Sequence, residues 1–126
     1  FVGKGVATTQ PEPETEVVSD KVLRGVGASK GLVTGPARVI TDLSEATSFQ
    51  SGEILVCMMT SPPWTILFTK AAAIVTETGG VLSHASIASR EYGLPCVAAV
   101  RNATSSIKSG TLITVDGTEG TVTIED

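Results

Sequence analysis

Short apolar runs of four or five residues alternate with helix-like stretches through the middle of this chain. The runs cover residues 53–57, 73–76 and 96–100, and each is too short for a core helix but has the usual length of a strand. Segments with helical patterning, residues 63–72 and 83–92, separate them. Alternation of this kind places successive strands in one sheet with helices packed against it. The pattern therefore predicts an α/β fold.

Both ends of this pattern are flanked by pairs of extended runs. The pairs are residues 22–26 with 35–40, and residues 111–115 with 120–124. A glycine-rich stretch joins the first pair and an Asp116-Gly117 turn joins the second, so each pair predicts a β-hairpin. Asp42 or Ser44 can cap a short helix over residues 45–49. Together these features predict a mixed sheet with packed helices and flanking β-hairpins.

Size and charge narrow the classes of protein that this chain can represent. Its 126 residues are 41% hydrophobic and 17% charged, which is ordinary for one globular domain. The formal net charge is -4 and no basic stripe is present, which argues against nucleic acid as a partner. No apolar run approaches the ~20 residues that a membrane-spanning helix needs. We therefore expect neither a nucleic-acid partner nor a membrane association.

The first twenty residues differ in composition from the rest of the chain. They carry four acidic residues against one lysine, and residues 8–16 combine acidic side chains with Pro11 and Pro13. Such a segment is typical of a solvated, semi-stiff linker. We predict a linker over residues 1–20 and a folded domain over residues 21–126. The linker can be a frayed terminus or an interdomain hinge, and the absence of a starting Met favours a hinge within a longer protein.

Two cysteines lie inside apolar strand-like runs. Cys57 ends the run 53–57 and Cys96 begins the run 96–100. In a chain with enough core material, both are predicted to be buried small hydrophobic side chains, with a disulfide or a reactive thiol as the alternative. This usage indicates a reducing, cytoplasmic setting.

One segment has the composition of a chemical site. A buried strand ends at Thr76, Gly79-Gly80 allows close backbone approach, and a helix begins near Ser83 with His84 in its first turn. Unpaired N–H groups and the positive end of the helix dipole stabilise an anion at such a place. A histidine beside an anion site can accept a phosphoryl group as phosphohistidine. The alternative is a surface or capping histidine next to an ordinary tight turn.

The chain lacks the motifs of a nucleotide-binding phosphate loop, of a serine hydrolase and of a structural zinc site. No G-x-x-x-x-G-K-[ST] phosphate loop and no G-x-S-x-G elbow occurs in the chain. One histidine and two separated cysteines cannot supply a structural zinc set, so no metal site is predicted.

The run from Gly79 to Val97, which reads GGVLSHASIASREYGLPCV, resembles the signature of the PEP-utilising enzyme mobile domain. The resemblance extends over residues 22–124, and residues 60–68 are similar to one branch of that family. That branch contains the phosphoenolpyruvate synthase (pyruvate-water dikinase), rifamycin phosphotransferase and phenylphosphate synthase types. The resemblance implies a swivelling β/β/α phosphohistidine domain of a multidomain phosphotransferase.

The resemblance also implies roles and partners. His84 would be the phosphoacceptor through Nε2, Thr76 would contact the imidazole or the phosphate, and Gly79, Gly80 and Ser83 would shape the loop and the helix start. The phosphoryl group would move between an ATP-grasp nucleotide-binding domain and a substrate-binding domain or subunit, with an acceptor such as pyruvate. Mg²⁺ and ATP, or PEP, would bind those partner domains, and no cofactor would bind this one. A catalytically silent interaction module is the alternative.

Three positions depart from the family pattern. Val81 stands where members often carry Arg, Glu77 replaces a common Asp, and Ser89 replaces a common Ala. Arg90 and Glu91 match the signature and are predicted to be structural or interface residues. Trp64 is predicted to be a core residue, with a docking role as the alternative.

Overall fold

The centre of the sheet consists of four parallel strands. These are β4 (Leu32–Val39), β5 (Ile54–Cys57), β6 (Ala73–Thr76) and β7 (Cys96–Ala98), each paired with the next. The computed structural model describes residues 22–125. The linker predicted over residues 1–20 therefore lies outside the described residues.

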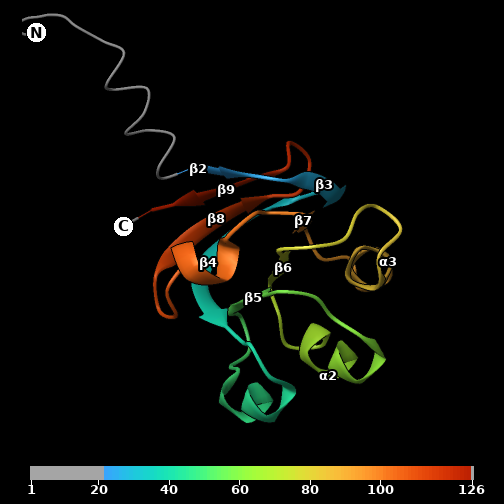
Figure 1. Cartoon of the computed structure of the whole chain (residues 1–126), viewed down its shortest axis with the longest axis vertical. Coiled ribbons are helices and arrows are strands. Elements are labelled where there is room, and N and C mark those ends of the chain that lie inside the picture. The colour runs from blue at the N-terminus through green and yellow to red at the C-terminus, as the bar shows by residue number, and fades with distance from the viewer. Residues whose placement is uncertain (1–21, 126) are drawn as a thin grey trace, which may run out of the picture.

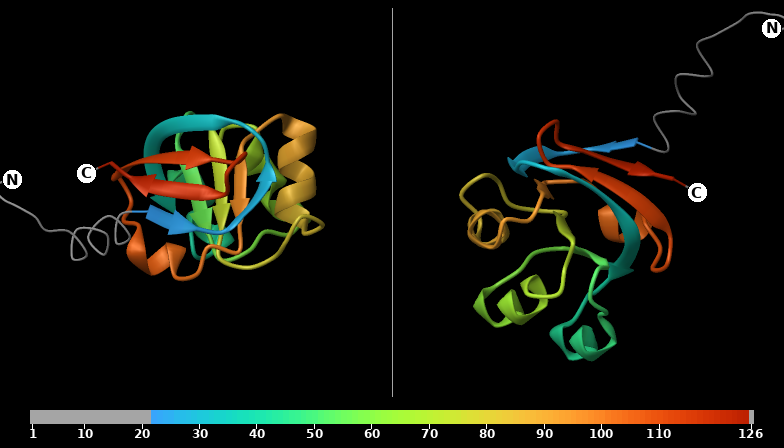
Figure 2. Two further views of the ribbon diagram at one scale, coloured as in Figure 1. Left: turned by 90° about the horizontal axis from the view of Figure 1, so that it is seen from above. Right: turned by 180° about the vertical axis from the view of Figure 1, so that it is seen from behind.

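Antiparallel strands complete the sheet on both sides of this centre. They are β8 (Leu112–Asp116), β9 (Thr121–Ile124), β2 (Val22–Arg24) and β3 (Val26–Ser29). The strand order is β2-β9-β8-β4-β5-β6-β7-β3. Only Gly25 separates β2 from β3, so the two ends of the order are one continuous stretch of chain. The sheet thus curls until that stretch closes it, as the view from above shows (Figure 2).

Short helices connect the parallel strands. The connections contain η1 (Leu43–Ser48), η2 (Pro62–Trp64), α2 (Thr65–Phe68) and α3 (His84–Tyr92), and α4 (Ala103–Ser106) follows β7. Figure 1 shows α2 and α3 on one side of the sheet, away from β2, β8 and β9. The α/β architecture with a mixed sheet and packed helices, predicted from the alternating pattern, is confirmed.

The strands β5, β6 and β7 are buried on both faces, and their side chains alternate between two hydrophobic clusters. Leu55, Cys57 and Ile74 join the cluster that contains Phe68 of α2 and residues of α3. Ile54 and Val56 join the cluster inside the curled sheet, together with residues of β8, β9 and α4. This period of two is the geometry of a pleated strand, and double burial explains why the runs read as continuously apolar.

Several local predictions are confirmed. The C-terminal hairpin forms between β8 and β9. Asp42 caps η1, with its carboxylate accepting from the N–H of Ser44. Ser83 is the N-cap of α3, and Gly93 ends that helix in the left-handed conformation, with φ of 71°. The start and the end of a helix depend on neighbouring residues, and for this reason both could be predicted from the sequence.

The N-terminal hairpin prediction is wrong. β2 pairs with β9 and β3 pairs with β7, whereas β4 pairs with β5 and β8. The glycines that indicated a turn instead permit close packing of strands. A Cβ on Gly25 would lie 2.3 Å from the carbonyl oxygen of Ala98, and one on Gly27 would lie 2.5 Å from that of Gly117.

The helix predicted over residues 63–72 is shorter in the structure. It consists of η2 and then α2, which ends at Phe68. The backbone N–H of Ala72 donates to the carbonyl of Glu53, and the carbonyl of Lys70 accepts from Gly52. These bonds tie the end of the segment to the start of β5 and stop the helix.

Both cysteines are buried and free, as predicted. Burial raises the pKa of the Cys57 thiol to about 12, and burial also raises that of Cys96. Neither thiol is therefore suited to nucleophilic chemistry.

No helix within residues 22–125 has both the length and the apolar character that crossing a bilayer requires.

Substitution of Gly117 tests the closure of the sheet. A Cβ at this position would lie 1.8 Å from the carbonyl oxygen of Ser29, a backbone atom of β3. We expect Gly117→Ala to lower the free energy of unfolding by about 2 kcal/mol or more, because closing strands must separate. Gly80→Ala is the matched control, since its Cβ would meet nothing within 4 Å. Equal urea midpoints for the two variants would contradict this account.

Candidate functional site

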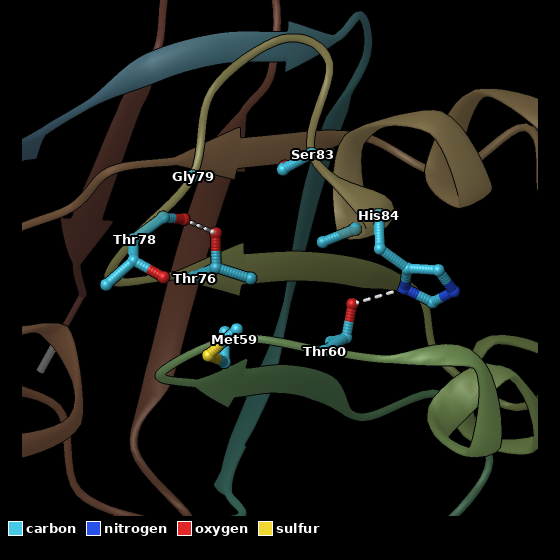
Figure 3. A pocket seen from close by; sticks show the side chains of 8 residues that line it. Met59, Thr60, Thr76, Thr78, Gly79, Ser83 and His84 are labelled. Carbon is cyan, nitrogen blue, oxygen red and sulfur yellow. Dashed lines mark hydrogen bonds between the residues drawn. The ribbon is translucent and has the colours of Figure 1, made fainter.

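The candidate site lies at the carboxyl ends of two neighbouring parallel strands. Cys57 ends β5 and Thr76 ends β6, and the two residues are paired in the sheet register. The loops that follow both strands therefore emerge side by side at one edge of the sheet. A pocket of about 180 Å³ lies between them. Its lining consists of Met59, Thr60, Thr76, Thr78, Gly79, Ser83, His84 and Ala85 (Figure 3).

His84 is the first residue of α3, and two side chains hold its ring. Nδ1 lies 2.7 Å from the hydroxyl oxygen of Thr60, a hydrogen bond that joins the two loops. Phe68 packs edge-on against the imidazole, with ring centroids 6.2 Å apart and an interplanar angle of 81°. Nε2 lies on the other side of the ring from this hydrogen bond (Figure 3). The ring is therefore oriented through Nδ1, and among the described residues Nε2 has no hydrogen-bond partner.

Sequence reasoning missed Thr60 and Phe68 as site residues. Both belong to the stretch that resembled one branch of the family, but no chemical role followed from the residues themselves. The available signal was positional: Thr60 comes three residues after β5, and His84 follows the neighbouring strand β6. The parallel pairing of those two strands was the missing information.

Ser83 stabilises the loop rather than capping the helix with its side chain. Its hydroxyl donates to the carbonyl of Gly80 at 2.8 Å, and the hydroxyl of Ser86 donates to the same oxygen at 2.5 Å. The backbone N–H of Ser83 lies 3.1 Å from that carbonyl as well. No side chain caps α3, so its leading N–H groups remain available at the edge of the pocket.

The two glycines of the loop have different roles. Gly79 has φ of 98°, and a Cβ there would lie 2.8 Å from the side chain of Ser83. Gly80 is not in the left-handed region, and its Cβ would meet nothing within 4 Å. Only Gly79 needs to be glycine for conformational reasons, whereas Gly80 contributes the carbonyl that anchors Ser83 and Ser86.

Thr76 lines the pocket but is fully buried at the end of β6. Its hydroxyl donates to the carbonyl of Thr78 at 2.9 Å, as Figure 3 shows. The structure thus places Thr76 in the lining of the same pocket as His84 and gives its hydroxyl a backbone partner in the loop. Contact of Thr76 with the imidazole or a phosphate stays a prediction.

Arg90 and Glu77 lie outside the pocket lining and hold its surroundings in place. The Arg90 guanidinium donates to the carbonyl of Ala28 at 2.9 Å and to that of Val81, so it ties the loop to β3. The Glu77 carboxylate accepts from the backbone N–H of Thr104 at 2.7 Å and from its hydroxyl. These contacts are structural, as predicted for Arg90. Trp64 is half-buried and packs against the cluster that contains Phe68.

The pocket offers no ligand set for a metal. None of its lining residues carries a carboxylate or a thiol. Within residues 22–125, no three His, Cys, Asp or Glu side chains come together as metal ligands.

Comparison with known proteins gives consistent matches. Residues 49–120 match the family described as "PEP-utilising enzyme, mobile domain". The "uncharacterized phosphotransferase YvkC" of Bacillus subtilis is 48% identical over 111 residues, which are 88% of this chain and 13% of that protein. The phosphoenolpyruvate synthase of Pyrococcus furiosus is 45% identical over 119 residues, or 94% of this chain and 14% of that protein. This chain therefore spans only a small part of the length of these relatives.

Among solved structures, an NMR solution structure of Enzyme I is similar in fold. It has a TM-score of 0.56 and 28% identity, over 64% of this chain and 33% of that chain.

The hydrogen bond between Thr60 and His84 can be tested by NMR. In Thr60→Val the imidazole loses its partner at Nδ1, so we expect the ratio of the two neutral tautomers to shift toward the form protonated at Nε2. Thr60→Ser keeps a hydroxyl at this place and should retain the original ratio. The ¹⁵N chemical shifts of the His84 ring measure the outcome. Identical shifts in Thr60→Val and the unmodified protein would contradict the assigned contact.

Proposed function

This chain belongs to the family of PEP-utilising enzyme mobile domains, and we propose that it works as a phosphohistidine carrier within a larger phosphotransferase. His84 would take a phosphoryl group at one site and deliver it at another. The observation that carries the proposal is the orientation of His84: Thr60 engages Nδ1, and Nε2 is left as the nucleophile.

The transfer step follows from this orientation. The lone pair of Nε2 forms the N–P bond as the bond between phosphorus and the leaving oxygen of the donor breaks. The step requires the tautomer that carries its hydrogen on Nδ1; in that tautomer the hydroxyl oxygen of Thr60, 2.7 Å away, would accept this hydrogen throughout the transfer. In the reverse sense, an acceptor oxygen attacks phosphorus and the electron pair returns to Nε2. The leading N–H groups of α3 and the loop at Gly79, which border the pocket, would receive the phosphate oxygens in this proposal.

Other domains must supply the rest of the reaction. We propose an ATP-grasp nucleotide-binding domain as one partner and a substrate-binding domain or subunit, with an acceptor such as pyruvate, as the other. The small share of the relatives' length that this chain covers supports such partners. The pocket has no carboxylate for Mg²⁺, so Mg²⁺ with ATP, or PEP, belongs to those domains in this proposal. The free, buried thiols fit a reducing, cytoplasmic setting.

Labelling tests the identity of the phosphoacceptor. With Mg²⁺ and radiolabelled ATP or PEP, the full-length protein should acquire an acid-labile, alkali-stable label at His84. His84→Ala should abolish the label and cost only about 1 kcal/mol of stability, from the hydroxyl of Thr60 left without its partner. Ser61→Ala, an exposed neighbour in the facing loop, should label normally.

Two results would contradict the carrier proposal. A label that persists in His84→Ala, or that maps to Ser83 or Thr76, would assign the nucleophile elsewhere. Absence of any label in the unmodified protein with both donors would favour a catalytically silent interaction module.

The loop glycines give a matched pair of variants. Gly79→Ala forces a Cβ into the left-handed region and against Ser83, so the loop must move. We expect it to slow the loading of His84 at least about tenfold, which corresponds to ~1.4 kcal/mol in the barrier. Gly80→Ala should load within about twofold of the unmodified protein, because its Cβ enters open space and the carbonyl is kept. The measurement is the initial rate of phosphohistidine formation, and equal rates for both variants would contradict the distinction.

A further inference from the structure

A second pocket lies toward the far end of α3 from His84. Its volume is about 440 Å³, which is within the range of natural sites for small organic molecules. Its lining comes from the end of β3, the turn after β3 and the end of α3: Ala28, Ser29, Lys30, Arg90 and Gly93. This lining shares no residue with that of the pocket that contains His84. The two pockets are therefore separate sites on one helix.

The lining of the second pocket carries two cations and no carboxylate, in a chain whose formal net charge is -4. Lys30 is exposed, and within residues 22–125 its ammonium forms no ion pair. The Arg90 guanidinium donates through Nε to the carbonyl of Ala28 and through Nη2 to that of Val81. A guanidinium has five N–H donors, so those of Nη1 and one of Nη2 have no partner among the described residues. The pocket thus offers uncompensated positive charge and several donors.

The size and chemistry of this pocket select an organic anion. The planar fork of a guanidinium matches the two oxygens of a carboxylate. The hydrocarbon stems of Lys30 and Arg90 and the methyl group of Ala28 supply apolar walls. An inorganic anion would use the charges and leave these walls uncovered. A carboxylate with a small apolar body satisfies both parts of the lining.

Arg90 connects the second pocket to the loop of the candidate site. The carbonyl of Val81, which accepts from its guanidinium, belongs to the loop between Gly79 and His84. The same guanidinium holds the carbonyl of Ala28 at 2.9 Å in the lining of the second pocket. A carboxylate bound to this guanidinium changes the strength of both bonds, because hydrogen bonds that share one group polarise one another. Arg90 is thus in contact with both the ligand and the loop.

We propose that the pocket formed by residues 28–30, Arg90 and Gly93 binds a small organic carboxylate, and that Arg90 transmits its binding to the loop before His84. The carboxylate oxygens accept from the remaining donors of Arg90 and from the ammonium of Lys30. The apolar body of the ligand lies against Ala28 and the side-chain stems. Binding at this site needs neither the histidine nor a phosphoryl group.

An NMR titration of the ¹⁵N-labelled protein with benzoate tests the site. The amide groups of Ser29 and Leu82 share peptide units with the carbonyls of Ala28 and Val81, which both accept from Arg90. We expect both amide signals to shift with one saturation curve. Benzamide has nearly the same shape without the charge, and it should bind at least about tenfold more weakly, because hydrogen bonds to charged groups are stronger than those to neutral ones.

Three variants locate the binding site. Lys30→Gln removes one of the two cations and should raise the Kd for benzoate at least about threefold. Lys108→Gln is the matched control, since it removes the same charge from an exposed lysine outside the lining and should leave the Kd unchanged. His84→Ala leaves the second pocket intact and should also bind benzoate with unchanged Kd.

Several outcomes would overturn the proposal. Absence of a saturable shift with benzoate, or equal affinity for benzamide, would overturn the carboxylate site. An equal effect of Lys30→Gln and Lys108→Gln would overturn its location, and loss of binding in His84→Ala would assign benzoate to the other pocket. Inorganic phosphate that binds as tightly as benzoate would overturn the role of the apolar walls. A shift of Ser29 without one of Leu82 would overturn transmission through Arg90.

Discussion

The parallel pairing of β5 with β6 is the interaction on which the site depends. Thr60 and His84 are 24 residues apart in the chain, and they meet because Cys57 and Thr76 end neighbouring strands in the same register. A slip of one residue in that register would turn every side chain of a strand to the opposite face. Burial of both faces of these strands opposes such a slip, since each face contributes to a separate hydrophobic cluster. The position of His84 therefore depends on the packing of the buried residues of β5 and β6 as well as on the contacts of its own ring.

Features that depend on neighbouring residues could be predicted from the sequence, whereas features that depend on pairing between distant segments could not. Strand lengths, the N-cap at Ser83 and the stop at Gly93 depend on near neighbours, and the sequence revealed them. The partner of Thr60 and the pairing of β2 and β3 depend on contacts between distant segments, which periodicity does not encode. Gly27, in the stretch interpreted as a turn, was misinterpreted for this reason. A glycine that permits a turn and a glycine that permits two backbones to touch look identical in the sequence.

The surroundings of His84 consist of residues that hold the ring in place and of a neighbouring exposed surface. Thr60, Phe68 and the hydroxyls on the Gly80 carbonyl hold the ring and its loop, while Arg90 secures the outer side of that loop to β3. The support consists of hydrogen bonds and packing that are complete within the domain. The neighbouring surface is apolar and uncharged, so what the site lacks is a compensating positive charge. The geometry of the site is thus set by contacts within the domain, whereas no Lys or Arg lines the pocket.

The antiparallel pairing of β2 with β9 has a mechanical consequence. Val22 is paired with Thr123, so the chain enters and leaves the fold through adjacent strands at one edge. Figure 1 shows this edge on the opposite side of the molecule from α3, whose first residue is His84. In a rotation about these two strands, the residues at the pivot would hardly be displaced, while the imidazole on the other side of the domain would travel along a longer arc. A modest change of angle would thus become a large translation of one nitrogen atom.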